Sequence, residues 1–246
     1  MKKLRRVTEP EVIAEFLKNE FYHEEFHPDR QQFEHLVLDA DISNQAENAL
    51  RRALLFRRRG HLWRELPADT QWWHVHIEAS DLQQIRVFPR AHWRKIANGS
   101  FDLNDIVARI RDRQFSGRTG AFVKKIESLS ARLRWEHDNS SILLIARDES
   151  HPVTILEGNH RLTASLLASP DILQTSFRVL CGFSPRMNQS CWYETNLANL
   201  LRYAAHRIRN IYDREADIER LLQQVEPERA KTYPAVAAPK AIANPK

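Results

Sequence analysis

The five residues from Glu157 to Arg161 (Glu-Gly-Asn-His-Arg) bring a carboxylate, an amide, an imidazole and a guanidinium together around one glycine. They lie between an apolar stretch typical of a strand, 153–156, and a stretch typical of a helix that begins at Leu162. The first amides of a helix have no partner within it, and its dipole is positive there, so such a junction attracts anions. Because Gly158 has no Cβ, the chain can turn sharply and a ligand can approach the backbone. The residues therefore predict a phosphate-binding corner.

The polar side chains of this corner have separate expected roles. Arg161 and His160 neutralise phosphate charge, since a guanidinium can donate two parallel hydrogen bonds to a phosphate. Glu157 is predicted to hold Mg²⁺, an acceptor hydroxyl or Arg161 itself, and Glu157 and His160 are predicted catalytic residues. The backbone of Asn159 positions the phosphate oxygens. The predicted cofactor-binding set comprises Gly158, Asn159, His160, Arg161 and Thr163.

The same five residues also have a purely structural interpretation. In that reading Gly158 makes a tight turn, Asn159 caps the helix, and His160 and Arg161 lie on the surface. Two apolar strands precede the turn, however, and the apolar stretch Leu-Thr-Ala-Ser-Leu-Leu follows it. Packing alone gives a buried strand little reason to end in four polar side chains, so the functional interpretation is preferred.

The elements that position the corner are predicted from hydrophobic periodicity. Alternating or continuous apolar stretches indicate strands at 73–77, 142–146, 153–156 and 177–181, with a short edge at 85–87. The predicted fold class is α+β, with a small mixed sheet between N-terminal and C-terminal helices. Four parts are expected: a helical segment over 1–71, the mixed-sheet core over 72–183, helices over 184–225 and a disordered tail over 226–246.

Apolar residues at helical spacing predict helices both before and after the mixed-sheet core. Thr8 begins a capping-box pattern, and a second N-terminal helix is expected over 44–62. Near the other end, a helix is expected over 192–212. Its packing face is predicted to consist of the apolar residues Leu197, Leu200, Leu201, Ala204 and Ile208, which leaves Arg202, Arg207 and Arg209 exposed.

Composition excludes several classes of protein. The chain has six glycines in 246 residues, and none has the spacing of a Walker loop or of a dinucleotide-binding turn. Two cysteines cannot build a disulfide framework or a four-thiolate zinc site, so a reducing cytoplasm is the expected location. His74 and His76 alternate on one strand without a third metal ligand nearby. No apolar run approaches the roughly 18 residues of a membrane span, so no membrane partner is expected.

The stretch from Val153 to Ala164 resembles the signature of the ParB/sulfiredoxin superfamily: a strand, an acidic or small residue, Gly, a variable residue, His or Arg, then Arg, and a helix. The strand and turn that run from Trp73 to Trp93 fit the opening of that fold, so the resemblance covers residues 72–183. It implies that the corner binds nucleotide phosphates. Members of the superfamily bind ATP (sulfiredoxin and the free serine kinases) or CTP (the ParB clamps).

Differences from the superfamily narrow the expected activity. Asn159 stands where sulfiredoxin has its reactive cysteine, so sulfiredoxin chemistry is not expected. The pair His160–Arg161 is closer to the Gly-His-His-Arg turn of the free serine kinases. Those kinases also use a glutamate in a Pro-x-x-Glu-like setting, where this chain has His92. His92 is therefore a candidate catalytic base, and the carboxylates that could enter from nearby are Glu78, Asp81 and Asp102.

The resemblance favours an ATP-dependent phosphotransferase that uses Mg²⁺ and acts on a small hydroxylated metabolite. An alternative is a DNA-associated regulator that binds nucleotide or backbone phosphate without turnover. Its nucleic-acid surface would be the arginine face formed by Arg51, Arg52, Arg57, Arg58 and Arg59. A ligand-binding or scaffold protein that keeps the fold without the chemistry is a third alternative. Four tryptophans, Trp72, Trp73, Trp93 and Trp135, could stack a base, although such residues usually belong to the core.

Overall fold

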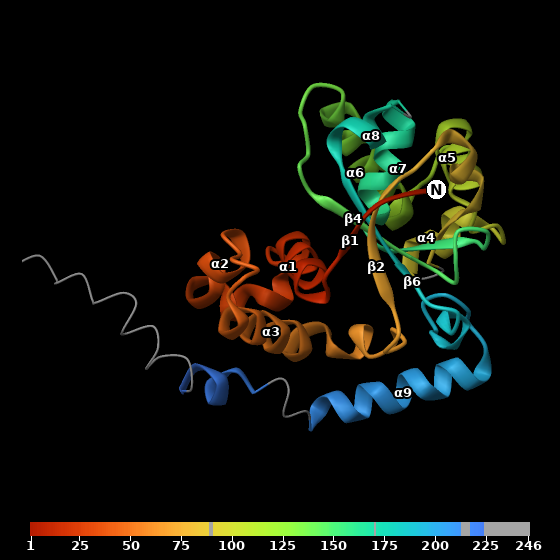
Figure 1. The fold of residues 1–246 in the computed structure, drawn as a ribbon. Helices are drawn as coiled ribbons and strands as arrows, with labels where there is room; N and C mark the ends of the chain where they lie inside the picture. The colour runs from red at the N-terminus through yellow and green to blue at the C-terminus, as the bar shows by residue number, and fades with distance from the viewer. Residues whose placement is uncertain (89–90, 170, 213–216, 224–246) are drawn as a thin grey trace, which may run out of the picture.

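A six-stranded mixed sheet forms the centre of the computed structural model, which describes residues 1–88, 91–169, 171–212 and 217–223 (Figure 1). The strand order is β1-β2-β6-β4-β5-β3. The strands are β1 (Lys2–Val7), β2 (Gln71–His76), β3 (Ile85–Val87), β4 (Ser141–Ala146), β5 (Val153–Glu157) and β6 (Arg178–Phe183). β4 runs parallel to β6 and antiparallel to β5, and β5 runs parallel to β3. The predicted α+β class is confirmed.

Helices cover both faces of this sheet. One face is covered by helices that precede β2 in the chain: α1 (Glu9–Glu20), α2 (Arg30–Leu38) and α3 (Gln45–Trp63). Those on the other face are α4 (Ala91–Ala97), α5 (Leu103–Asp112), α6 (Gly117–Leu133), α7 (Asn159–Ala168) and α8 (Ile172–Ser176), and α9 (Leu197–Ile211) follows β6. Short 3₁₀ turns lie at η1 (Glu24–Asp29), η2 (Ala79–Gln84) and η3 (Met187–Gln189).

β4 shows why this part of the sequence reads as one continuous apolar run. All six of its residues are buried. Ile142 and Leu144 pack into the core with α4 to α8, whereas Leu143 and Ile145 pack into the core with α1 to α3. A strand covered on both faces needs apolar side chains in both directions, so the alternation of a half-exposed strand disappears.

The first residues of the chain differ from the prediction. Helices were expected throughout 1–71, but Lys2–Val7 form the edge strand β1, which pairs antiparallel with β2. The segment reads Lys-Lys-Leu-Arg-Arg-Val, and only Val7 is buried. Charged side chains are common on edge strands because they discourage further strand pairing, and they also hide the apolar alternation that identifies a strand.

Polar contacts along α1 fix this helix against the sheet. Thr8 caps the helix by accepting a hydrogen bond from the amide of Glu11. Arg178 on β6 donates to Glu11 and Glu15. At the last turn, Asn19 Nδ2 donates to the carbonyl oxygen of Ser141, 2.7 Å away. These contacts place the C-terminal end of α1 next to the start of β4.

The C-terminal helix α9 packs the other way round from the prediction. The expected packing residues Leu197, Leu200, Leu201 and Ile208 are exposed. Its contacts with the rest of the protein come instead from a polar face that includes Asn199 and His206. The predicted disordered tail, 226–246, lies outside the described residues.

Candidate functional site

The turn between β5 and α7 has the strained geometry that only glycine adopts readily. Gly158 has φ +98° and stands immediately before α7, whose first helical hydrogen bond runs from the amide of Leu162 to the carbonyl of Gly158 at 2.8 Å. A Cβ at this position would lie 3.1 Å from Cγ1 of Ile142 on β4. The tight turn therefore places the first amides of α7 at the end of β5, which lies between β4 and β3.

A pocket of about 370 Å³ opens at this corner. Residues 157–161 form one side, and the end of α1 with the turn that follows it forms the other, through Asn19, Glu20 and His23. Trp93 of α4 and Phe122 of α6 complete the lining. The corner thus faces a pocket, but one wall of that pocket comes from the N-terminal helical segment rather than from the predicted core alone.

Arg161 lies in this pocket and is held there by two oxygens. Its Nη2 donates to Oε1 of Glu157 at 2.5 Å, and its Nη1 donates to Oδ1 of Asn19 at 3.2 Å. Because Asn19 also binds the carbonyl of Ser141, the guanidinium is positioned from α1, β4 and β5 at once. Its side chain is 16% exposed, so it is not fully sealed inside the protein.

Two carboxylates share the pocket. Glu157 ends β5, and the buried Glu20 ends α1, where Arg59 of α3 donates to it at 2.8 Å. Burial raises the pKa of Glu157, the charge of Arg161 opposes that effect, and the negative charge of Glu20 adds to it. A carboxylate with a raised pKa takes up a proton more readily, so this group is suited to general base catalysis.

The raised pKa of Glu157 predicts that stability depends on pH. The unfolded chain releases this proton near the ordinary pKa of 4.5, whereas the folded protein keeps it to higher pH. The free energy of unfolding should therefore fall as pH rises from about 4.5 through the raised pKa. We expect Glu157→Gln to show a smaller fall when urea unfolding is measured at about pH 5 and about pH 8. The exposed Glu127→Gln is the control, and identical pH dependences for both variants would contradict the assignment.

The two histidines predicted as catalytic occupy different places. His160 is exposed at the start of α7, and its ring centroid lies 4.8 Å from that of Phe122 and 5.4 Å from that of Trp93. His92 stacks on Phe122 at 5.1 Å, but it is not among the residues that line the pocket. Of the two, only His160 stands where it could contact a ligand in this pocket directly.

Asn159 and Thr163, both predicted to bind the cofactor, differ in their position relative to the pocket. Asn159 lines the pocket and is buried, and its Oδ1 has no hydrogen-bond partner among the residues that the structure describes. Thr163 is fully buried and donates its hydroxyl to the carbonyl of Asn159 at 2.7 Å, so it supports the first turn of α7 from behind. A buried acceptor without a donor is costly in a folded protein, and a ligand that donates a hydrogen bond would satisfy it.

The sequence offered Glu78, Asp81 and Asp102 as additional carboxylates, and each has another role here. Glu78 and Asp81 form the capping box of η2, Asp81 also accepts from the N-terminal ammonium group at 2.5 Å, and Asp102 pairs with Arg86. Glu20 enters the pocket in their place. No motif marks Glu20, because a lone acid at the end of an amphipathic helix is typical of a solvated surface. Its burial beside Arg59 and Glu157 depends on how α1 packs against α3 and the sheet.

Metal binding by side chains alone has no support in the part of the chain that the structure describes. Three or more His, Cys, Asp or Glu side chains are nowhere grouped there to hold an ion. Mg²⁺, however, commonly takes only one or two carboxylates and completes its coordination with phosphate oxygens and water. Glu157 and Glu20 are the residues of this pocket that could serve as those ligands.

A second, polar pocket of about 570 Å³ adjoins the first. The two have Glu20, His23 and Glu157 in common. Its other walls come from α3, α9 and the segment before α9, and include His61 and Tyr203. Two molecules bound in the two pockets would therefore meet at the pair of carboxylates.

The arginine face of α3 is largely used inside the protein. Arg51 is buried and donates to the carbonyl of Leu36 at 3.0 Å. The other four arginines form ion pairs with acidic residues: Arg52 with Glu9, Arg57 with Asp29 and Glu219, Arg58 with Asp29, and Arg59 with Glu20 and Glu25. Charges neutralised in this way make a poor surface for the phosphate backbone of a nucleic acid.

Comparisons with known proteins add no relative from which a function could be transferred. No protein-family model, no curated protein and no solved structure matches this chain. Within the described residues, none of the helices is both long and apolar enough to span a membrane.

Proposed function

We propose that this chain binds a nucleoside triphosphate, ATP in the first place, in the pocket between α1 and α7, and transfers its terminal phosphoryl group to a small hydroxylated molecule. The observation that carries the proposal is the shared position of Arg161, the first turn of α7 and two carboxylates around one pocket of about 370 Å³. The resemblance of residues 153–164 to the ParB/sulfiredoxin superfamily supports a nucleotide as the ligand.

The phosphates would bind at the start of α7. The backbone amides of Asn159, His160 and Arg161 precede the first helical hydrogen bond, so they can donate to phosphate oxygens. The guanidinium of Arg161 lies on the same side of the turn and can stabilise charge that develops during transfer. Mg²⁺ held by Glu157 and Glu20 would supply further positive charge, which a triphosphate needs beside two carboxylates.

The base would lie against the aromatic wall. Trp93 and Phe122 both line the pocket, and their ring centroids are 5.1 Å apart in an edge-to-face arrangement. Aromatic faces bind the faces of nucleobases with little preference for their hydrogen-bonding edges. This wall supports binding of a nucleobase without by itself distinguishing one nucleotide from another.

The acceptor would lie in the adjoining pocket of about 570 Å³, next to the same carboxylates. In the transfer, the acceptor oxygen bonds to the γ-phosphorus while the bond from that phosphorus to the β–γ bridging oxygen breaks, which leaves ADP. The acceptor proton passes to a carboxylate that lines both pockets, Glu157 or Glu20.

A thermal-shift panel of ATP, ADP, CTP and GTP, each with and without Mg²⁺, tests the proposal. Binding to the folded state alone raises the melting temperature, because it stabilises the protein by about 2.7 kcal/mol at a hundredfold excess over Kd. The expected result is a rise of several degrees with ATP and Mg²⁺ and a smaller rise with ADP. Melting temperatures that no nucleotide changes would contradict the proposal.

Asn159→Ala is expected to separate ligand binding from stability. The variant removes a buried acceptor that has no partner within the described part of the chain, so the free energy of unfolding should change by less than about 1 kcal/mol. Nucleotide affinity should fall about tenfold, because a hydroxyl or amino group of the nucleotide that donates to Oδ1 loses its acceptor. Urea unfolding and equilibrium titration with ATP and Mg²⁺ measure the two effects. A large loss of stability with unchanged affinity would assign Asn159 to the fold instead.

A further inference from the structure

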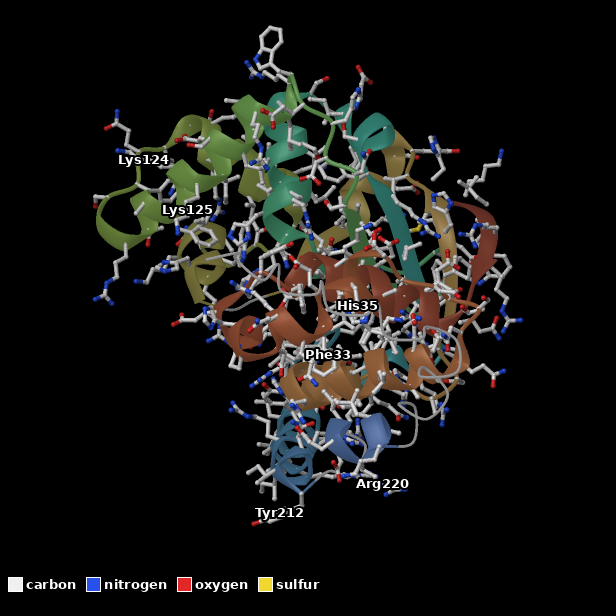
Figure 2. All side chains as sticks on the ribbon, turned by 90° about the vertical axis from the view of Figure 1, so that its left-hand side faces the viewer. Phe33, His35, Lys124, Lys125, Tyr212 and Arg220 are labelled. Carbon is white, nitrogen blue, oxygen red and sulfur yellow. The ribbon has the colours of Figure 1, made fainter. Side chains whose placement is uncertain are left out.

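A third pocket, of about 320 Å³, lies between α3, the loop that precedes β2, and α9. Its described lining has no residue in common with the two pockets of the proposed reaction. Figure 1 and Figure 2 both show α9 below α3, and Figure 2 shows Tyr212 at the end of α9, directed away from α3. Gly60 lets the two helices approach closely, because a Cβ there would collide with the side chain of Asn210. The pocket is therefore enclosed by elements that pack against each other.

The described lining of this pocket carries more positive than negative charge. Arg52 of α3, Arg64 of the loop and Arg209 of α9 face it together with a single acidic residue, Glu9. In the pocket between α1 and α7, by contrast, the described lining has two carboxylates and one arginine. A cleft with an excess of one sign of charge concentrates ions of the opposite sign. The third pocket thus favours an anion without the help of Mg²⁺.

Two of these arginines are held in place by their neighbours. The guanidinium carbons of Arg52 and Arg64 lie 4.6 and 4.8 Å from the ring centroid of Phe56. Arg52 also donates to Oε1 of Glu9 at 2.7 Å, and Nε1 of Trp63 donates to the same oxygen at 2.9 Å. Because donors that the protein already holds lose little freedom on binding, more of their attraction to an anion appears as affinity.

The helix α9 supplies two further donors from the opposite side. Nδ1 of His206 donates to the buried carboxylate of Glu65 at 2.7 Å, and the other oxygen of that carboxylate accepts from the amide of Cys191 at 2.9 Å. With Nδ1 engaged, Nε2 is the ring nitrogen of His206 that remains for a ligand. Arg209 forms no ion pair or side-chain hydrogen bond within the described residues. Its guanidinium is therefore the group of this pocket that a ligand engages at least cost.

We propose that this pocket binds a small organic phosphate monoester. A phosphate group carries up to two negative charges and accepts hydrogen bonds on three oxygens, so it suits guanidinium groups that approach from α3, the loop and α9. A planar carboxylate is matched by one guanidinium fork. Next to the arginines the lining is apolar, through Leu66, Pro67, Ala68 and Trp72, and it would contact the organic part of the ligand. Such a ligand would join α9 to α3.

Isothermal titration calorimetry of the full chain with phenyl phosphate, in low salt and without Mg²⁺, tests this site. Arg209→Ala should weaken binding about tenfold, because a charged hydrogen-bond donor is lost, and Arg209→Glu about a hundredfold. The melting temperature of both variants should stay that of wild type, since Arg209 is exposed. Arg52→Gln, on the opposite wall, should also weaken binding about tenfold. Arg132→Glu is the matched control, because it reverses an exposed charge on α6 and should bind as wild type does.

Two other ligands test the chemical class. Inorganic phosphate should bind more weakly than phenyl phosphate, because it lacks a part that contacts the apolar lining. Succinate, which is also a dianion, should bind more weakly still. Inorganic phosphate or succinate that binds as tightly as phenyl phosphate would overturn the assignment to a phosphate monoester.

Arg161→Ala separates this site from the pocket of the proposed reaction. Phenyl phosphate should bind this variant with the affinity of wild type, because Arg161 lines the other pocket. Binding that is lost in Arg161→Ala and kept in Arg209→Glu would place the phosphate at the start of α7 and overturn the proposal. No heat of binding with wild type at about 10 mM phenyl phosphate would overturn it as well.

Discussion

Arg161→Ala is expected to lower the rate of ATP-dependent ADP formation by about 10²–10³-fold and to weaken ATP binding. Arg161 stands next to the first turn of α7 and pairs with Glu157, so its removal leaves the Glu157 carboxylate without that partner beside the phosphates. Repulsion between Glu157 and a triphosphate then opposes binding, and no guanidinium stabilises the charge that develops in transfer. Release of ADP from ATP and Mg²⁺, with and without candidate hydroxylated acceptors, measures the effect.

Two further variants make this result interpretable. Arg161→Lys keeps the positive charge but loses the two-pronged donor, so its rate should fall between wild type and Arg161→Ala. Arg132→Ala removes an exposed arginine of α6 and should change nothing. Equal rates for wild type and Arg161→Ala, with both proteins folded, would remove this pocket as the reaction site.

Gly158→Ala is expected to lower the free energy of unfolding by about 2–4 kcal/mol. Two effects add in this variant: a left-handed backbone conformation costs a non-glycine residue roughly 1–2 kcal/mol, and the new Cβ meets Ile142 at 3.1 Å. Nucleotide binding should weaken as well, because the turn that presents the amides of α7 must shift. Urea unfolding gives the stability, and titration with ATP and Mg²⁺ gives the affinity.

Gly99→Ala is the matched control for that variant. Gly99 has nearly the same φ, +102°, but a Cβ there would have no neighbour within 4 Å. Its loss of stability should be about 1–2 kcal/mol, which is the backbone cost alone. The difference between the two variants therefore measures the contact with Ile142. Equal losses would show that the turn is not tightly packed on β4.

The sequence predicted the centre of the fold well for a physical reason. β4 and the first three residues of β5 are buried, and buried strands are built from continuous apolar runs such as 142–146, which few other structures require. The turn at Gly158 and the start of α7 follow from residues next to each other in the chain. The predicted corner was therefore local, and the structure shows it open to a pocket.

The features that were missed depend on contacts between distant parts of the chain. Glu20 reaches the pocket only because α1 packs beside β4. The residues around Glu20 in the sequence do not predict that it lines a pocket. The sequence of β1 did not predict a strand, because its lysines and arginines obscure the alternation of apolar residues. For α9, periodicity correctly identified an apolar face, but periodicity does not state whether that face meets its own chain or another molecule.

Hydrogen–deuterium exchange of the full chain, with and without ATP and Mg²⁺, tests the central claim most directly. Amides that bind phosphate exchange more slowly. The account predicts that nucleotide slows exchange in peptides covering 158–162 and in those at the end of α1, near Asn19 and Glu20. Slowed exchange confined to other segments, or no change at saturating nucleotide, would contradict a nucleotide site at the start of α7.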